Sequence, residues 1–243
     1  MMKKFLPYSL SLLAWGLVAP LAHADAIAAK PGNAAADFDI VKAEVVTAGG
    51  NLSFRMEVLG KVGGSMPSAG GKVPGASVFS YVWPTKLNSS EVGFEPDQGI
   101  LSLAVTAHPD FDDTPLVDEN GDGNPKNDGA LWHSHWVVLV PDEQCGPGAL
   151  KVKDIPEGTK PKLPATWPGL PILIDSPNFK PDLKDKTVEV RVPLKSVGAV
   201  SGVAYDGVTA GLRVNANLHA PFLCVVNVFD VASGDLSLPG KMR

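Results

Sequence analysis

The stretch "ALWHSHWVVLV", residues 130–140, places two histidines one residue apart in a run that is otherwise typical of a buried β-strand. Side chains at positions i and i+2 of a strand lie on the same face. His133 and His135 are therefore predicted to project together. The same face would carry three apolar residues, Leu131, Val137 and Leu139. Since imidazole is a poor filler for an apolar core, the pair indicates either a bound ion or a buried hydrogen-bonded structure.

Short β-type runs of the same kind recur along the whole chain, and none shows sustained helical periodicity. Apolar and polar residues alternate most clearly at 52–58 and 187–192. The other predicted strands are 38–46, 76–84, 100–107, 150–155, 207–218 and 224–231. The sequence "TAGGN", residues 47–51, predicts a hairpin between the first two runs. Together these runs predict an all-β fold, a single antiparallel β-sandwich-like domain over residues 25–243.

Two long loops rich in proline and glycine separate some of the predicted strands. They are "GKVGGSMPSAGGKVPG", residues 60–75, and "IPEGTKPKLPATWPGLP", residues 155–171. Segments of this composition lie on the surface of β proteins, where they either cover a binding site or only connect strands.

The chain opens with two lysines, an apolar stretch and the small-x-small sequence Ala22, His23, Ala24. This order predicts a signal peptide over residues 1–24, with an apolar part too short for a membrane anchor. We therefore expect a periplasmic, secreted or cell-surface protein without a membrane span. The net charge of −5 becomes −7 once Lys3 and Lys4 are removed with the leader. This acidity argues against nucleic acid as a partner and favours metal ions.

Two cysteines, Cys145 and Cys224, are present in the chain. In an oxidising compartment an isolated pair is most simply a disulfide bond. A cysteine ligand to copper is the alternative, and it would require one of the two thiols to stay free.

Two histidines rarely complete a metal site, so further ligands are needed. His108 directly follows the run 100–107, and His219 directly follows the run 207–218. We expect His219 to meet His133 and His135 across the sheet, with His108 as a further candidate. Neutral imidazoles with an apolar surround suit copper and zinc equally.

The segment before the histidine strand is rich in acidic and amide side chains. Asp118, Asn120 and Asp122 alternate and Gly123 follows, which matches the opening of a calcium-binding loop. The glutamate that completes an EF-hand is missing, because Gly129 stands at its position. The predicted calcium ligands are Asp118, Asn120, Asp122, Asn124 and Asp128. A solvated turn held by its own side chains is the alternative.

This chain is predicted to be an exported β protein with an acidic loop, a strand in which an aromatic residue or a histidine stands two positions before a histidine, and a distant single histidine. In these features it resembles the copper-binding surface proteins of methane-oxidising bacteria, the MopE and CorA type. In that family two histidines and a tryptophan oxidised to kynurenine bind copper. The resemblance implies that His135 and His219 match the two histidines, and that His133 stands in the place of the tryptophan. It favours copper over zinc, and it leaves modification of Trp132 or Trp136 open.

Three functions follow from these patterns. The first is a non-catalytic protein that takes up, stores or hands on copper, with a delivery partner that the sequence does not identify. The second is a zinc enzyme with a three-histidine site, in which Asp110, Asp112 or Glu143 would act as a base. The third is a binding module stiffened by calcium. The absence of a G-x-S-x-G sequence argues against a standard α/β-hydrolase.

Overall fold

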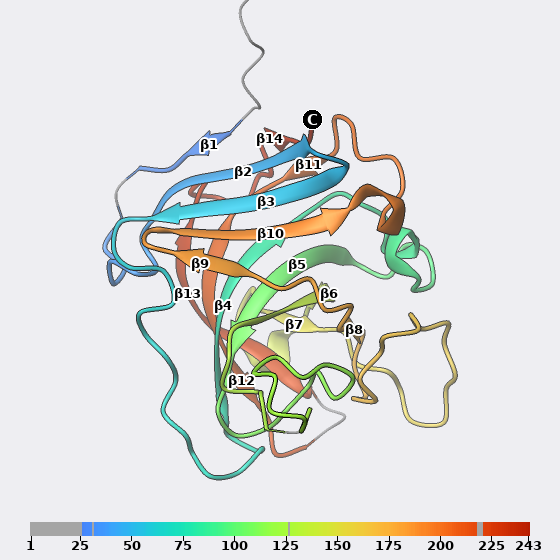
Figure 1. The fold of residues 1–243 in the computed structure, drawn as a ribbon. Helices are drawn as coiled ribbons and strands as arrows, with labels where there is room; N and C mark the ends of the chain where they lie inside the picture. Colours follow the sequence, from blue (N-terminus) through green and yellow to red (C-terminus); the bar gives the residue numbers. More distant parts are fainter. Residues whose placement is uncertain (1–25, 31, 126, 218–220) are drawn as a thin grey trace, which may run out of the picture.

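The computed structural model describes residues 26–30, 32–125, 127–217 and 221–243, and it consists of two packed β layers (Figure 1). The predicted leader, residues 1–24, and the predicted ligand His219 lie outside these ranges. Within the described ranges, no helix is long and apolar enough to cross a membrane.

The first layer is an antiparallel sheet of five strands that crosses over the second layer. In spatial order its strands are β1 (Ile27–Ala28), β2 (Ile40–Ala48), β3 (Asn51–Val58), β10 (Thr187–Pro193) and β9 (Asp182–Lys184). Strands β2 and β3 form the predicted hairpin, with Ala48 paired to Asn51. Gly49 and Gly50 both have positive φ, 57° and 78°, as a two-residue type I′ turn requires.

The second layer is a six-stranded antiparallel barrel. Its strands in spatial order are β5 (Ile100–Ala107), β4 (Ser77–Pro84), β12 (Val208–Val214), β13 (Leu223–Val231), β7 (Leu150–Val152) and β6 (His133–Pro141). Pairing between β5 and β6 closes the barrel, and in that register Thr106 lies opposite His133. Closure removes the unpaired strand edges that an open sheet would expose.

Several short elements complete the described chain. Strand β8 (Ile174–Asp175) pairs with β6, and β11 (Ala204–Tyr205) pairs with β14 (Gly240–Lys241). Three single turns of 3-10 helix connect strands: η1 (Ser89–Val92), η2 (Glu143–Cys145) and η3 (Leu194–Ser196).

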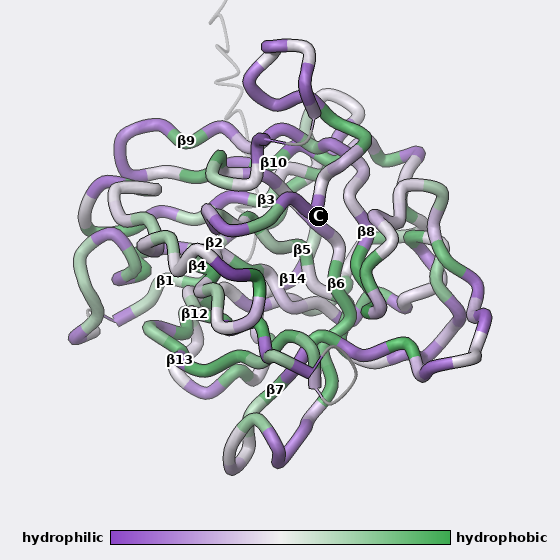
Figure 2. Tube along the Cα trace, turned by 90° about the horizontal axis from the view of Figure 1, so that it is seen from below, coloured by the Kyte–Doolittle hydropathy of each residue, from purple (hydrophilic) through white to green (hydrophobic). Residues whose placement is uncertain are grey.

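Strand alternation divides the buried residues between two cores. Leu103 and Val105 of β5 belong to the core between the barrel wall and the five-stranded sheet, where Phe54 packs edge-on against Trp83 and Trp136. Ala104 on the same strand belongs to the core inside the barrel. Figure 2 shows the apolar residues following the strands, whereas the outlying loops are mostly hydrophilic. Strands β4, β5 and β6 thus each separate two apolar regions.

The all-β prediction is confirmed, and each of the nine predicted runs contains a strand. The structure differs from a simple sandwich in one respect, because the second layer closes on itself. The predicted disulfide is also present: Cys145 in η2 is bonded to Cys224 in β13. The bond closes a loop over a sequence separation of 79 and ties the end of the histidine strand to another wall of the barrel.

Candidate metal site

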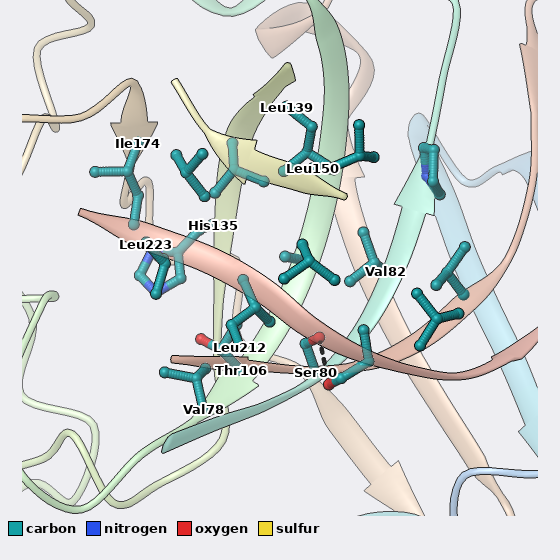
Figure 3. A pocket seen from close by; sticks show the side chains of 18 of the residues that line it. Val78, Ser80, Val82, Thr106, His135, Leu139, Leu150, Ile174, Leu212 and Leu223 are labelled. Carbon is teal, nitrogen blue, oxygen red and sulfur yellow. Dashed lines mark hydrogen bonds between the residues drawn. The ribbon is translucent and has the colours of Figure 1, made fainter. Parts of the chain in front are cut away.

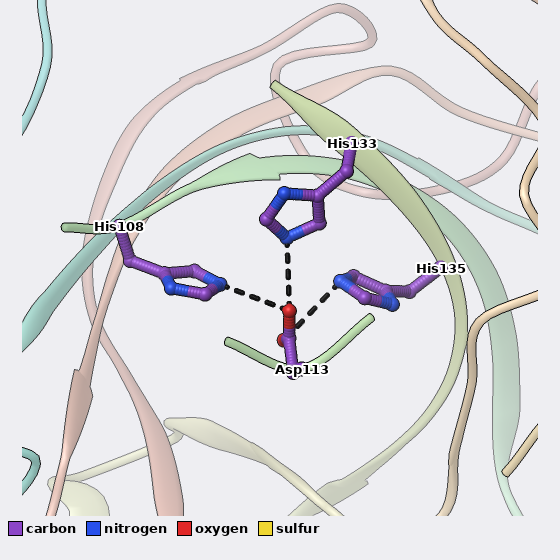
Figure 4. A group of neighbouring side chains, drawn as sticks. All are labelled: His108, Asp113, His133 and His135. Carbon is purple, nitrogen blue, oxygen red and sulfur yellow. Dashed lines mark ion pairs between the residues drawn. The ribbon is translucent and has the colours of Figure 1, made fainter. Parts of the chain in front are cut away.

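Three histidines and one aspartate converge at one end of the barrel (Figure 4). His133 and His135 are the first and third residues of β6, and their rings point to the same side as the alternation predicts. His108 follows the last residue of β5, the neighbouring strand. Asp113 lies in the loop that leaves β5. All four side chains are buried, with exposed fractions of 1–5 %.

The two ends of the loop between β5 and β6 are hydrogen-bonded to each other, and this bond fixes His108 opposite the histidine strand. The amide of His108 donates a hydrogen bond to the carbonyl of Gly129, with 3.1 Å between N and O. Gly129 can sit there only because it has no Cβ, since a Cβ would lie 1.8 Å from the Phe111 carbonyl oxygen. The loop is therefore pinned at its base while Asp113 folds back under the rings.

The four ligand groups form a tight cluster around the Asp113 carboxylate. His133 Nε2 lies 3.0 Å and His108 Nε2 lies 3.2 Å from Asp113 Oδ1, and His135 Nε2 lies 3.2 Å from Asp113 Oδ2. One ligand atom from each residue lies within 4.8 Å of all the others. Four ligands at the corners of a tetrahedron, each about 2 Å from one ion, are roughly 3.3 Å apart. The spacing suits a first-row transition-metal ion at the centre.

Each histidine uses its other ring nitrogen to hold its orientation. His133 Nδ1 donates to the Leu131 carbonyl at 2.7 Å, and His108 Nδ1 donates to the Phe111 carbonyl at 3.2 Å. His108 is further held by the Phe111 ring, which stacks on it with the two centroids 3.9 Å apart. These acceptors have no proton to give, so Nδ1 carries the proton in both rings.

His135 is held through a serine. Its Nδ1 lies 3.0 Å from Ser176 Oγ, and that hydroxyl donates to the Asp113 backbone carbonyl at 2.8 Å. The serine proton is thereby committed to the carbonyl, so Ser176 accepts from His135 Nδ1. All three Nε2 atoms are left to face the centre of the cluster. A metal-binding histidine is commonly fixed by an outer hydrogen bond of this kind.

The electrostatics of the cluster call for a cation. The three Nε2 atoms and Asp113 Oδ1 are buried and have no hydrogen-bond partner among the described residues. Imidazole lone pairs aimed at a carboxylate repel one another unless a positive charge lies between them. Either protons or a metal ion can supply that charge, and a metal ion does so without placing three buried positive rings side by side.

The pKa values of the cluster depend on two opposing effects, burial and the attraction between Asp113 and the imidazoles. Burial alone would raise the pKa of Asp113, but the three imidazoles hold it well below its ordinary value. Burial disfavours the charged form of His133, yet the carboxylate of Asp113 raises its pKa above the ordinary value. At His135 burial prevails and lowers the pKa. The carboxylate is thus ionised, as a metal ligand must be.

Two cavities adjoin the cluster. Asp113, His108 and His135 line a cavity of about 100 Å³ inside the barrel. His133 lines a separate pocket of about 370 Å³, together with Trp132, Glu119 and residues 178–181. Three of the four candidate ligands therefore face the interior of the barrel.

The structure brings together three of the four histidines predicted as ligands, His108, His133 and His135. It adds Asp113, which the sequence analysis did not identify. Three aspartates, at positions 110, 112 and 113, follow the first of these histidines, and nothing in their spacing tells which one turns inward. The pairing of β5 with β6 is the signal that could have found Asp113, since it places the whole loop beside the histidine strand.

The other acidic candidates lie elsewhere. Asp110 accepts hydrogen bonds from the amides of Gly70 and Gly71, at 2.9 and 2.7 Å. Asp112 accepts from the Thr114 amide. Glu143 lies in η2, beyond the opposite end of β6. None of these three belongs to the cluster of four, so the helper bases suggested by the sequence are not placed on it.

The predicted calcium ligands form a turn that their own side chains hold. The Asp118 carboxylate accepts hydrogen bonds from the amides of residues 121, 122 and 123. Asp122 accepts from the Asn124 amide and from the Asn127 side chain, and the Asn120 side chain accepts from the Asp122 amide. Asp128 is buried and accepts from the Glu119 amide at 2.9 Å.

The tryptophans of the histidine strand face away from the cluster. Trp132 packs against Tyr81, with ring centroids 5.1 Å apart, and Trp136 packs edge-on against Phe54. Both belong to the core between the barrel and the five-stranded sheet. The cluster is therefore built from imidazole and carboxylate groups.

Comparison of the chain with protein-family models, with curated proteins and with solved structures gives no match.

Proposed function

We propose that this chain is an exported protein that binds one divalent transition-metal ion, copper(II) in preference to zinc, and that it holds the ion for storage or transfer. The observation that carries the proposal is the convergence of three imidazole Nε2 atoms on a buried carboxylate, where these atoms and Asp113 Oδ1 have no hydrogen-bond partner among the described residues. The cluster can bind a metal ion; the identity of the ion and the export of the chain are our proposals.

The choice of copper(II) rests on the chemistry of the ligands. Imidazole nitrogen suits both copper and zinc, and the carboxylate oxygen of Asp113 disfavours copper(I), which prefers sulfur ligands. Among divalent ions of the first transition row, copper(II) binds nitrogen and oxygen ligands most tightly. The disulfide between Cys145 and Cys224 fits an oxidising compartment, in which copper(II) would persist.

The holding role rests on burial. All four ligands are at most 5 % exposed. A closed set of four protein ligands is typical of sites that retain a metal ion, whereas catalytic sites keep a position open.

The test is the metal content of the full chain, exported by its own leader and recovered without added metal. We expect copper close to one ion per chain, bound more tightly than zinc in competition with a chelator. Replacing both His133 and His135 by alanine should abolish binding. An electron paramagnetic resonance spectrum of the copper(II) form should show coupling to nitrogen, which the double variant would lose.

Two single variants sharpen the ligand assignment. Asp113→Asn should weaken copper binding, whereas Asp110→Asn, which makes the same change in charge three residues away, should leave it unchanged. His219→Ala tests the predicted ligand outside the described residues, and full affinity in this variant would confine the site to the cluster of four. Copper binding that survives loss of both His133 and His135 would refute the proposal.

A zinc enzyme is the second candidate, and one observation favours it. Asp113, His108 and His135 line the cavity inside the barrel, so a bound ion could meet a small molecule there. A zinc ion lowers the pKa of a bound water and generates hydroxide near neutral pH. Ester hydrolysis that rises in proportion to zinc content, and that is lost in His133→Ala, would select this alternative.

We further propose that calcium orders the loop from Asp118 to Asp128. Support comes from Asp128, whose Oδ1 is buried without a hydrogen-bond partner among the described residues, and from the alternating oxygen donors that calcium prefers. Calcium titration followed by calorimetry tests this, with Asp118→Asn and Asp128→Asn as variants expected to lose binding. If both variants give the same heat of calcium binding as the wild type, these residues do not bind calcium, and the turn is held only by its own hydrogen bonds.

A further inference from the structure

The barrel encloses an almost entirely aliphatic cavity of about 100 Å³, and every one of its six strands contributes to the wall (Figure 3). Val78 and Val82 of β4, Val137 of β6 and Leu212 of β12 point inward around it. Small side chains, Ala104 of β5 and Ala210 of β12, leave the space open. The cavity exists because short side chains face one another across a narrow barrel.

The size and lining of this cavity limit what can occupy it. A water molecule takes up about 30 Å³, and an apolar cavity of about 150 Å³ stays dry and admits benzene or xenon. The space inside this barrel therefore suits a molecule of roughly three to five heavy atoms. Among the described residues, the candidate metal ligands are the only ionisable side chains that line it, so a charged occupant away from them would lose its hydration without compensation.

One hydroxyl group on the wall has no hydrogen-bond partner among the described residues. Thr106 is only 8 % exposed, and its Oγ1 is buried with no hydrogen-bond partner among the described residues. Ser80, on the neighbouring strand, differs because its hydroxyl donates to the Ala210 carbonyl at 2.9 Å. Burying a hydroxyl without a partner costs free energy. A ligand that hydrogen-bonds to Thr106 would recover that cost.

His108, Asp113 and His135 line this cavity, so it adjoins the candidate metal site. Val228 of β13 also lines it and is 57 % exposed, so the wall is in contact with solvent at this residue.

We propose that the barrel interior binds a small uncharged molecule with an apolar body and one hydroxyl or carbonyl group, of the size of a short-chain alcohol. The aliphatic wall holds the body, and Thr106 Oγ1 forms a hydrogen bond with the polar group. The inference goes beyond metal binding, and it holds for the protein with or without a metal ion.

The test uses xenon and 1-propanol as probes, with propionate and propylammonium as charged counterparts of similar size. Binding is followed by methyl NMR of the full mature chain labelled at valine and leucine. We expect xenon and 1-propanol to shift the resonances of Val78, Val82 and Val137, and we expect neither charged compound to do so. Equal response to the charged compounds, or shifts confined to the outer surface, would overturn the proposal.

Matched variants locate the site. Ala104→Val fills the cavity and should weaken both neutral probes by at least about tenfold. Ala107→Val places the same extra methyl groups on the other face of β5 and should leave both affinities unchanged. Thr106→Val should weaken 1-propanol by about fivefold, the size of one net hydrogen bond, and leave xenon unchanged because xenon forms none. If Ala104→Val fails to fold, Ala210→Val fills the same space from β12.

Measurements on chelator-stripped and metal-loaded protein separate this proposal from the proposed function. Propanol binding in protein that takes up no metal would refute only the metal-binding function. Metal uptake without any response to xenon or 1-propanol would refute only the cavity proposal.

Discussion

Ser176 is hydrogen-bonded to His135, with 3.0 Å between Oγ and Nδ1, and the same hydroxyl donates to the backbone carbonyl of Asp113. One side chain from outside the cluster thus fixes the ring of one ligand and the backbone of another. Ser176 follows β8, the short strand outside the barrel that pairs with β6, so this added strand supports the site.

Ser176→Ala is expected to lower the affinity for copper(II) by about 10- to 100-fold, the usual cost of losing an outer hydrogen bond to a metal-binding histidine. Ser134→Ala is the matched control, because Ser134 is also buried and its hydroxyl donates to the Phe179 carbonyl at 2.6 Å. Chelator competition measures both variants. Equal affinity in the wild type and in Ser176→Ala would show that His135 does not depend on this support.

Metal affinity should rise with pH through neutrality. The pKa of His133 is raised above its ordinary value by Asp113 despite burial, so its proton persists to higher pH than that of an ordinary histidine. An incoming metal ion must displace this proton. We expect affinity to change by about tenfold per pH unit below the pKa of His133 and to level off above it. Competition assays between about pH 6 and pH 8 measure the curve.

Glu119 provides a check on the pH dependence, because its charge also contributes to the raised pKa of His133 and it is not one of the four ligands. Glu119→Gln should move the curve toward lower pH, since less proton competition remains at neutrality. A flat affinity across the whole range in the wild type would contradict the proton-displacement argument.

Two buried threonines should respond oppositely to replacement by valine. Thr106 Oγ1 has no partner among the described residues, so Thr106→Val should raise the free energy of unfolding by about 1 kcal/mol. Thr209 Oγ1 donates to the Phe38 carbonyl at 2.6 Å in a fully buried position. Thr209→Val should therefore lower the free energy of unfolding by about 1–3 kcal/mol. Urea denaturation of both variants gives the comparison, and destabilisation by Thr106→Val would indicate a partner for that hydroxyl.

Loss of the disulfide should lower the free energy of unfolding. The bond between Cys145 and Cys224 closes a loop over a sequence separation of 79. In the chain-entropy model, this restriction lowers the entropy of the unfolded chain and so stabilises the folded state by about 4–5 kcal/mol. Cys145→Ser combined with Cys224→Ser should lower the free energy of unfolding by an amount of that order in denaturant titrations. Reduction of the wild type should have a similar effect, and a change below about 1 kcal/mol would contradict the model.

Local alternation predicted the strands well because it depends only on neighbouring residues. The run 130–140 placed its histidines on one face and Trp136 on the other, and both assignments are confirmed. The two glycines at 49 and 50 predicted the first hairpin correctly. The short strands β1, β8, β9, β11 and β14 were missed, because two or three residues are too few to show a period.

Features that depend on distant pairings were beyond the reach of the sequence. Barrel closure needs β5 to pair with β6, which lies across a long loop. The same pairing makes His108 a member of the cluster and turns Asp113 inward, whereas Asp110 binds the amides of the 60–75 loop instead. Residue type and spacing indicated a candidate metal site and three of the four residues that form it; the tertiary fold selected among the acidic residues.

The cluster also lies at one end of the seam where β5 and β6 close the barrel, with His108 on one side of the seam and His133 and His135 on the other. An ion bound by these residues would link β5 to β6, so the barrel would open from this end first when the ion leaves. Backbone amide hydrogens along both strands would then exchange more slowly in the metal-bound protein than in the metal-free protein.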